Sequence, residues 1–247
     1  MIGMTLLETR DLVKRYGGRV VVDGVSIRID QRSIVGLLGR NGAGKTTTFR
    51  MIMGMITPEG GEVVFDGRDI TRLPMFRRAR LGIGYLSQEP SIFQRLSVMD
   101  NLLAILETMS LSGAERRHKA QKLMERFALQ EVADSQGRFL SGGERRKLEI
   151  ARAMVTDPSL ILLDEPFSGV DPIAVEELQQ EIRRLASGGV SILITDHNVR
   201  RTLEVVDKAT IIDHGKVMAE GTPAQIIRDA KVRELYLGNT FSGDEFN

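Results

Sequence analysis

Short apolar runs, separated by long polar stretches, dominate the hydrophobic pattern of this chain. Four of them contain four or five residues each: Ile34–Leu38, Ile83–Leu86, Leu160–Leu163 and Ser191–Thr195. Strands of a parallel sheet show this pattern because helices cover both faces of the sheet. The sequence therefore predicts an α/β core built on a parallel sheet, with a helix over residues 47–55 after the first strand.

The N-terminal part of the chain has a different period. Val25–Ile29 alternates apolar and polar residues, which is typical of a strand with one polar face. Val63–Phe65 ends at Asp66-Gly67, a dipeptide that favours a tight hairpin turn. We expect an antiparallel β subdomain here.

A mostly helical segment separates the second and third parallel strands. Ser112 and Glu115 have the spacing of a capping box at a helix start. An apolar stripe follows at helical spacing, which we expect to be core; it consists of Ala120, Leu123, Met124, Phe127 and Ala128. These patterns predict a discontinuous core over residues 1–88 and 158–238, a helical subdomain inserted at 89–157, and a C-terminal tail at 239–247.

The first parallel strand leads into a glycine-rich loop with the pattern G-x-x-x-x-G-K-[ST], typical of a P-loop NTPase core. Backbone N–H groups in such a loop can surround phosphate oxygens, and the helix N-terminus that follows adds partial positive charge. We expect Lys45 to reach the β- and γ-phosphates of a nucleoside triphosphate, and the Thr46 hydroxyl to bind Mg²⁺. The alternative is a glycine-rich turn without a ligand, which a lysine and a threonine at these offsets disfavour. The loop consists of Gly39, Arg40, Asn41, Gly42, Ala43, Gly44, Lys45 and Thr46.

Polar residues also follow the other three apolar runs. Gln88 lies just after the second run, Asp164 and Glu165 after the third, and His197 after the fourth. The carboxyl ends of parallel strands meet at one edge of a sheet, where ligands bind. For phosphoryl transfer at that edge, Asp164 would support Mg²⁺ and Gln88 would bind the metal or a water. Glu165 would act as general base, and His197 would contact the γ-phosphate. The alternatives are a helix cap for Asp164 and a solvated surface position for His197.

A second helix start has the sequence Leu-Ser-Gly-Gly-Glu over Leu140–Glu144. Ser141 and Glu144 have capping-box spacing. The glycines Gly142 and Gly143, however, cost up to about 1 kcal/mol each relative to alanine in a helix. Close approach of an anion to the backbone would explain them. Apolar residues at helical spacing support a helix here: Leu148, Ala151 and Val155.

Composition narrows the function classes. The formal charge of this 247-residue chain is +1, which gives no broad electrostatic basis for binding nucleic acid. The chain has no cysteine, so disulfides, cysteine-bound zinc and thiol catalysis are excluded. The charged first apolar stretch does not resemble a signal peptide. No run approaches the ~20 apolar residues of a membrane span, so we expect any membrane role to depend on a partner.

Together these motifs resemble those of the ABC-type ATPases, in the same order and over nearly the whole chain. The resemblance implies the ABC ATPase fold, with ATP and Mg²⁺ as cofactors. It also implies a homodimer that holds two ATP molecules head to tail between its subunits, so that each signature helix covers the nucleotide of the other subunit. The strings that resemble Walker A, Q-loop, signature, Walker B, D-loop and H-loop are Gly39–Thr46, Gln88, Leu140–Glu144, Leu162–Pro166, Ser168–Asp171 and His197.

The resemblance extends the set of nucleotide-binding residues. Tyr16 matches the aromatic residue that stacks on adenine, and its alternative is an ordinary surface tyrosine. Glu144 stands where glutamine is commoner in the family. The further residues that would contact nucleotide are Thr47, Ser141, Gly142, Gly143, Glu144 and Asp171.

Longer strings resemble the ATPases that power lipopolysaccharide export, with transmembrane permeases as partners and a location on the cytoplasmic face of the inner membrane. Tyr236–Gly238 also fits the export ATPases but is shared with ATPases of branched-chain amino-acid importers, so it does not discriminate. Arg40 points toward the importers, which stay an alternative. A soluble ABC ATPase acting on DNA or ribosomes is a third, disfavoured by the single Walker A motif. The segment Ser91–Leu96 either fills the core or forms a groove, centred on Phe93, that receives a permease helix. The export-type strings are Gln88–Phe93, Leu96–Val98, Leu140–Arg146, Asp164–Ile173 and Thr195–Arg200.

Overall fold

The computed structural model describes residues 4–169 and 171–237, so the tail predicted at 239–247 lies outside the described residues. Its strands form a four-stranded sheet in the order β2-β1-β4-β5 and a six-stranded sheet in the order β10-β9-β3-β8-β7-β6. The first sheet contains β1 (Thr5–Tyr16), β2 (Arg19–Asp30), β4 (Gly60–Phe65) and β5 (Arg68–Asp69). The second contains β3 (Ile34–Gly39), β6 (Ile83–Leu86), β7 (Leu160–Asp164), β8 (Ser191–Thr195), β9 (Lys208–Asp213) and β10 (Lys216–Gly221).

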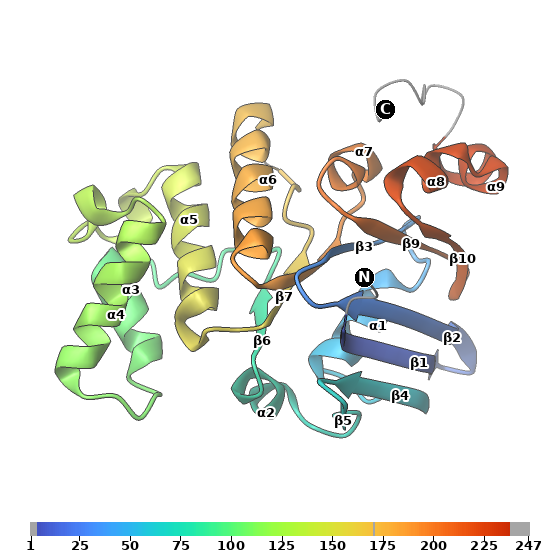
Figure 1. Ribbon diagram of the computed structural model, residues 1–247, viewed down its shortest axis with the longest axis horizontal. Coiled ribbons are helices and arrows are strands. Elements are labelled where there is room, and N and C mark those ends of the chain that lie inside the picture. The colour runs from blue at the N-terminus through green and yellow to red at the C-terminus, as the bar shows by residue number, and fades with distance from the viewer. Residues whose placement is uncertain (1–3, 170, 238–247) are drawn as a thin grey trace.

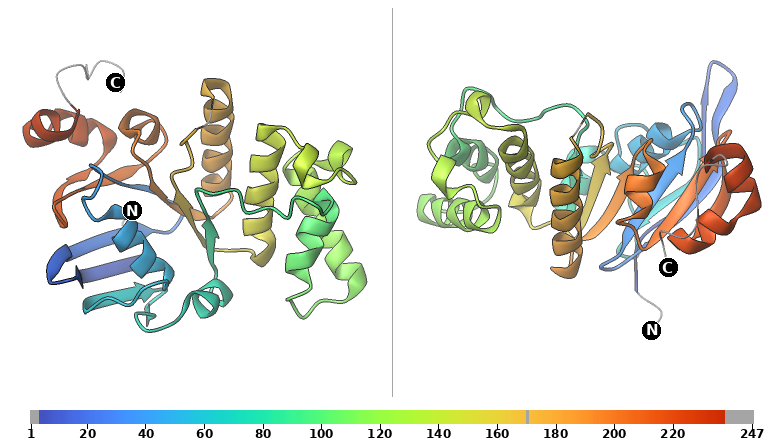
Figure 2. Two further views of the ribbon diagram at one scale, coloured as in Figure 1. Left: turned by 180° about the vertical axis from the view of Figure 1, so that it is seen from behind. Right: turned by 90° about the horizontal axis from the view of Figure 1, so that it is seen from above.

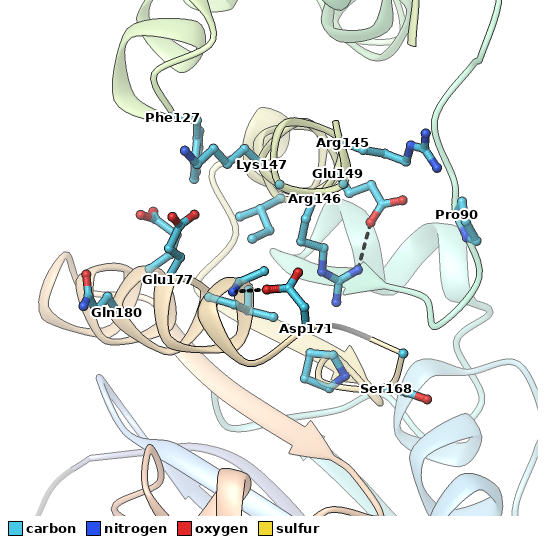
Figure 3. A pocket seen from close by; sticks show the side chains of 18 of the residues that line it. Pro90, Phe127, Arg145, Arg146, Lys147, Glu149, Ser168, Asp171, Glu177 and Gln180 are labelled. Atoms are coloured by element: carbon cyan, nitrogen blue, oxygen red, sulfur yellow. Dashed lines mark hydrogen bonds and ion pairs between the residues drawn. The ribbon is translucent and has the colours of Figure 1, made fainter. Parts of the chain in front are cut away.

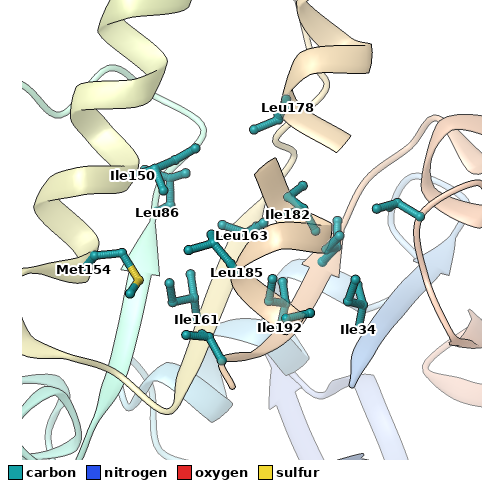
Figure 4. Packing of buried hydrophobic residues seen from close by; sticks show 14 of the residues in the cluster. Ile34, Leu86, Ile150, Met154, Ile161, Leu163, Leu178, Ile182, Leu185 and Ile192 are labelled. Atoms are coloured by element: carbon teal, nitrogen blue, oxygen red, sulfur yellow. The ribbon is translucent and has the colours of Figure 1, made fainter. Parts of the chain in front are cut away.

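The four apolar runs form adjacent strands of the six-stranded sheet, which confirms the predicted parallel core. β6 pairs with β7, β7 with β8, and β8 with β3, each in parallel. Successive side chains of a strand point to opposite faces. Accordingly, Ile161 and Leu163 enter one buried cluster, while Leu160 and Leu162 enter the other. Figure 4 shows the first cluster, where Ile150 of a helix and Met154 of the turn that follows it pack beside Leu86 and Ile161 of the sheet.

The predicted antiparallel subdomain is also confirmed. β1 pairs with β2 and β4 in antiparallel register, and β4 turns into β5 at Asp66 and Gly67. Both turn residues have positive φ, 49° and 72°, as a tight hairpin requires. The helix after the phosphate loop, α1 (Lys45–Met53), begins and ends two residues earlier than predicted. Gly44 is its N-cap, and Gly54 ends it by adopting a left-handed conformation.

The helical segment contains α3 (Val98–Leu106), α4 (Gly113–Arg126) and α5 (Gly142–Ala153), which lie together on the far side of the molecule from the antiparallel sheet (Figures 1 and 2). The capping box of Ser112 and Glu115 is confirmed at the start of α4. The prediction that Ala128 joins the buried stripe was wrong. The helix ends at Arg126 with Phe127 as its C-cap, and Ala128 is exposed with a φ of 50°. Short 3₁₀ turns occupy Gln130–Val132, Gly137–Phe139 and Met154–Thr156.

The remaining helices complete the core. α2 (Met75–Arg80) precedes β6, α6 (Pro172–Ser187) packs across the six-stranded sheet, and α7 (Val199–Leu203) follows β8. After β10 come α8 (Pro223–Arg228), α9 (Ala230–Val232) and a last helical turn at Arg233–Leu237. The strand β9, which precedes these C-terminal helices, pairs in parallel with β3 beside the phosphate loop.

Candidate functional site

The glycine-rich loop between β3 and α1 is closely packed against backbone from distant parts of the chain. A Cβ on Gly39, which has a φ of 152°, would lie 2.2 Å from the Ile212 carbonyl oxygen. A Cβ on Gly44 would lie 2.7 Å from the Val21 carbonyl oxygen. Both positions therefore admit only glycine. Gly44 is also the N-cap of α1 and makes no side-chain capping bond, so no side chain of the cap occupies the first amides of the helix.

Lys45 points back into this loop. Its Nζ donates to the carbonyl oxygens of Gly39 at 2.7 Å and Arg40 at 3.1 Å, and the side chain is buried. Burial lowers the pKa of Lys45, and the carboxylates at the neighbouring strand ends oppose that lowering. An ammonium held among backbone carbonyls and carboxylates suits an anionic ligand.

The carboxyl ends of β6, β7 and β8 bring three of the predicted residues into contact. Gln88 donates to the Glu165 carboxylate at 3.0 Å, and the His197 Nδ1 lies 3.4 Å from the same carboxylate oxygen. Glu165 has a φ of 46°, a strained conformation for a residue with a side chain, of the kind that collects at functional sites. The structure thus places an amide, a carboxylate and an imidazole within one small cluster.

The strand β8 supports this cluster with residues that the sequence reasoning missed. The Thr195 hydroxyl donates to Asp164 at 2.7 Å, and the Thr195 carbonyl accepts from the Glu165 N–H at 2.7 Å. The fully buried Asp196 accepts from the N–H groups of Phe167 and Asn198. Asp164 therefore lies beside Thr195, its partner on the neighbouring strand. The only sign of this support in the sequence was that two polar residues, Asp196 and His197, follow the apolar run Ser191–Thr195.

The second glycine-rich helix start is built differently. The Glu144 carboxylate accepts from both the N–H and the hydroxyl of Ser141, at 2.8 and 2.7 Å, and the Ser141 hydroxyl accepts from the Glu144 N–H. These bonds lower the pKa of Glu144. A Cβ on Gly142 or Gly143 would meet no atom within 4 Å. Packing within the described chain therefore does not require glycine at either position.

A cavity of about 460 Å³ connects the second helix start with the strand ends. Figure 3 shows it between α5, which contributes Arg146 and Lys147, and α6, which contributes Glu177 and is preceded by Asp171. Asp171 also caps α6 by accepting from the Ala174 N–H at 3.0 Å. Five of the predicted site residues line this cavity: Gln88, Gly142, Gly143, Glu165 and Asp171.

The predicted residues Tyr16, Thr46 and Thr47 do not line that cavity. Tyr16 ends β1 with half of its surface exposed, and the Lys14 ammonium lies 5.6 Å from its ring centre. Thr46 and Thr47 lie in the first turn of α1, where Thr46 is exposed. Within the described part of the chain, no group of three or more histidine and acidic side chains is arranged to hold a metal ion.

Comparison with known proteins gives a consistent family. Residues 22–168, more than half of the chain, match the family model described as ABC transporter. Residues 216–242 match a second model, described as branched-chain amino acid ATP-binding cassette transporter.

Individual relatives cover almost the entire chain. The lipopolysaccharide export system ATP-binding protein LptB of Acidithiobacillus ferridurans is 51% identical over 96% of this chain and 98% of its own length. LptB of Escherichia coli K12 is 51% identical over 96% of this chain and 99% of its own length. Among solved structures, the ADP conformation of the ABC transporter cassette MJ1267 matches with a TM-score of 0.87 and 29% identity, over 95% of this chain and 99% of that one.

These matches agree with the geometry of the loop and the strand ends, and they confirm the predicted fold class. This chain belongs to the ABC transporter family, as a subunit that binds and hydrolyses ATP.

Proposed function

We propose that this ABC transporter subunit powers the export of lipopolysaccharide, through transmembrane permeases on the cytoplasmic side of the inner membrane. The observation that carries the proposal is the 51% identity with LptB proteins over nearly the full length of both chains. Within residues 4–169 and 171–237, every helix is too short or too polar to span a bilayer. Attachment to the membrane would therefore use permease subunits.

Each motif has a role in this proposal. The amides of the phosphate loop and Lys45 bind the triphosphate, and Tyr16 stacks on the adenine ring. Glu165 removes a proton from the attacking water, while Gln88 and His197, both in contact with Glu165, orient that water and contact the γ-phosphate.

A magnesium ion fits the oxygen donors at this edge. Thr46 offers a hydroxyl, Gln88 an amide oxygen and Asp164 a carboxylate, which are the hard ligands that Mg²⁺ prefers. Mg²⁺ is typically bound through only one or two carboxylates together with phosphate oxygens and water, so the absence of a larger acidic cluster among the described residues is compatible with it. When bound, the ion neutralises charge on the phosphates.

We further propose that two copies of the chain act head to tail. A Cβ on Gly142 or Gly143 would meet no atom within 4 Å, and the Ser141 helix start opens beside the cavity lined by Glu165 and Asp171. An anionic nucleotide held by a second subunit would satisfy that helix start.

The docking of a permease would use the segment after Gln88, in which two neighbouring residues differ in their exposure to solvent. Ile92 is buried in the core, whereas Phe93 remains 48% exposed. The fully buried Asn101 fixes the backbone of Phe93 by accepting from its N–H at 2.8 Å and donating to its carbonyl at 3.0 Å. The Arg152 guanidinium lies 4.6 Å from the Phe93 ring centre. A rigid, exposed aromatic beside a cation suits an amphipathic helix with an acidic end.

We expect Phe93→Ala to leave the isolated protein folded and able to bind ATP, yet to release it from its membrane partner. The melting temperature and the amount of permease recovered by pull-down would be measured on the same preparation. A folded variant that recovers the permease at the wild-type level would place the docking surface elsewhere.

The importer function is the second candidate, because the C-terminal residues 216–242 match the branched-chain amino-acid transporter model. Purification of the tagged chain from native membranes, followed by identification of the attached subunits, distinguishes the two functions. Export-type permeases support the proposal. Permeases accompanied by a solute-binding protein would contradict it.

A further inference from the structure

The hydroxyl of Tyr236, in the last described helical turn, makes both of its bonds to the first glycine of the phosphate loop. It accepts from the Gly39 N–H at 2.9 Å and donates to the Gly39 carbonyl at 3.2 Å. Gly39 lies beyond Leu37, the last residue of β3 that pairs with β8. A residue 197 positions away in the chain therefore holds the point where the strand becomes the loop.

The same glycine carbonyl also holds Lys45. The Gly39 oxygen accepts from the Lys45 ammonium at 2.7 Å, so its two lone pairs are shared between the lysine and the tyrosine. Gly39 also packs closely against β9, where it pairs with Ile212 and where the Ile212 carbonyl leaves no room for a Cβ. The position of the lysine thus depends on a glycine that Ile212 confines and Tyr236 holds.

The C-terminal part of the chain holds the loop at a second point. The Gly215 N–H, in the turn between β9 and β10, donates to the Ala43 carbonyl at 2.9 Å. Gly39 and Ala43 lie near opposite ends of the phosphate loop. The C-terminal part of the chain therefore holds two carbonyls of the loop, those of Gly39 and Ala43.

Burial raises the pKa of the Tyr236 phenol to about 12. The hydroxyl consequently keeps its proton at neutral pH and can donate and accept at the same time.

We propose that Tyr236 is a positioning residue for nucleotide binding, whose hydroxyl fixes Gly39 and, through Gly39, the ammonium of Lys45. The C-terminal turn Arg233–Leu237 thereby sets how tightly the phosphate loop holds ATP and ADP. This inference rests on the proposed role of the phosphate loop as the nucleotide site.

The test is Tyr236→Phe, which removes the hydroxyl and keeps the ring. Loss of hydrogen bonds to a backbone that cradles the ligand should weaken ATP and ADP affinity roughly 3- to 10-fold. The turnover rate at saturating ATP should change less than about 2-fold, because the same cradle acts in ground and transition states. Affinity would be measured by titration with a fluorescent ATP analogue in the presence of Mg²⁺, and by competition with ADP.

Two control variants make the outcome decisive. Leu235→Ala changes a half-exposed residue of the same turn and should leave affinity unchanged. Lys45→Ala reports on the loop itself and should lose most of the affinity. Unchanged affinity in Tyr236→Phe, with a large loss in Lys45→Ala, would overturn the inference and leave the nucleotide site in place. Unchanged affinity in both would overturn the nucleotide site as well. A lower melting temperature with unaltered affinity of the folded protein would make Tyr236 a purely structural residue and would also overturn the inference.

Discussion

The two glycine-rich helix starts of this molecule look alike in sequence and differ in structure. The start of α1 has a glycine cap without a side-chain bond, and its loop glycines press against the backbone of β2 and β9. The start of α5 has a complete capping box, in which Ser141 and Glu144 bond to each other, and its glycines face open space.

This difference indicates which of the two helix starts needs a partner. The loop before α1 is shaped by its own chain, with Lys45, Gly215 and Tyr236 holding its carbonyls. The start of α5 is stable as a helix start, but nothing in the described chain accounts for Gly142 and Gly143. On the function proposed above, the first region would bind phosphate with residues of one chain, whereas the second would need a partner chain. The head-to-tail dimer proposed above would supply that partner.

The largest effect is expected at Glu165, whose charge acts on Lys45 of the first helix start. This residue contacts Gln88 and lines the cavity shared with the α5 glycines. Glu165→Gln keeps the size of the side chain and removes the base, so hydrolysis should fall by about 10²- to 10⁴-fold while ATP binding persists. The measurement is phosphate release beside an ATP-binding titration, and turnover near the wild-type rate would remove Glu165 from its proposed role.

A matched pair of glycine substitutions tests the difference between the two helix starts directly. In Gly39→Ala the new Cβ would overlap the Ile212 carbonyl at a strained φ, so the free energy of unfolding should fall by more than about 2 kcal/mol and ATP binding should be lost. Gly143→Ala should leave that free energy unchanged or slightly higher, since alanine favours a helix. It should keep ATP binding by the monomer and still reduce hydrolysis at least about 10-fold, because the backbone must approach a ligand closely.

Urea unfolding and ATP titration of both variants are the required measurements. If Gly143→Ala hydrolyses ATP at the wild-type rate, the open space at α5 has no role in catalysis. If Gly39→Ala is as stable as the wild type, the phosphate loop is less constrained than its contacts indicate.

The smallest effect concerns the capping box of α5. Glu144→Ala should lower the free energy of unfolding by about 0.5–1 kcal/mol at neutral pH. The bonds from Ser141 depress the pKa of Glu144 below its ordinary value of 4.5. The stabilisation is therefore present above that value and is lost as the pH falls through the folded-state pKa, so wild type and variant should converge in acid.

Glu115→Ala is the matched control, because Ser112 and Glu115 form the same box at α4 and likewise lower the pKa of Glu115. Both variants should lose similar stability in unfolding experiments at pH 7, but only Glu144→Ala should also change ATP hydrolysis. An equal change of hydrolysis in the two variants would mean that the effect at α5 is only one of stability.

The sequence predicted the parts of the fold that depend on local pattern. The four buried strands, the hairpin at Asp66-Gly67 and both capping boxes follow from period, turn chemistry and spacing, and the structure contains them. Ala128 shows the limit of periodicity, because a left-handed residue ends the helix without a glycine to signal it. β9 and β10 were not predicted.

Local sequence patterns could not predict contacts between residues far apart in the chain. Nothing local indicates that Tyr236 bonds to Gly39, or that the Thr195 hydroxyl donates to Asp164. The second contact results from the strand order of the sheet, in which β8 lies beside β7, and the first from the return of the C-terminal turn to the end of β3. The candidate residues could therefore be identified from motifs, whereas their supports required the three-dimensional arrangement.

The central claim, that each nucleotide is shared between Lys45 of one subunit and Ser141 of the other, is tested most directly with mixed dimers. A chain carrying both Lys45→Ala and Ser141→Arg would be paired with a wild-type chain, and the ATP hydrolysis of the isolated heterodimer measured. In the head-to-tail arrangement both sites are damaged, so activity should fall far below half of the wild-type dimer. Retention of about half of the wild-type activity, as expected if both residues serve one site within the same chain, would contradict the account.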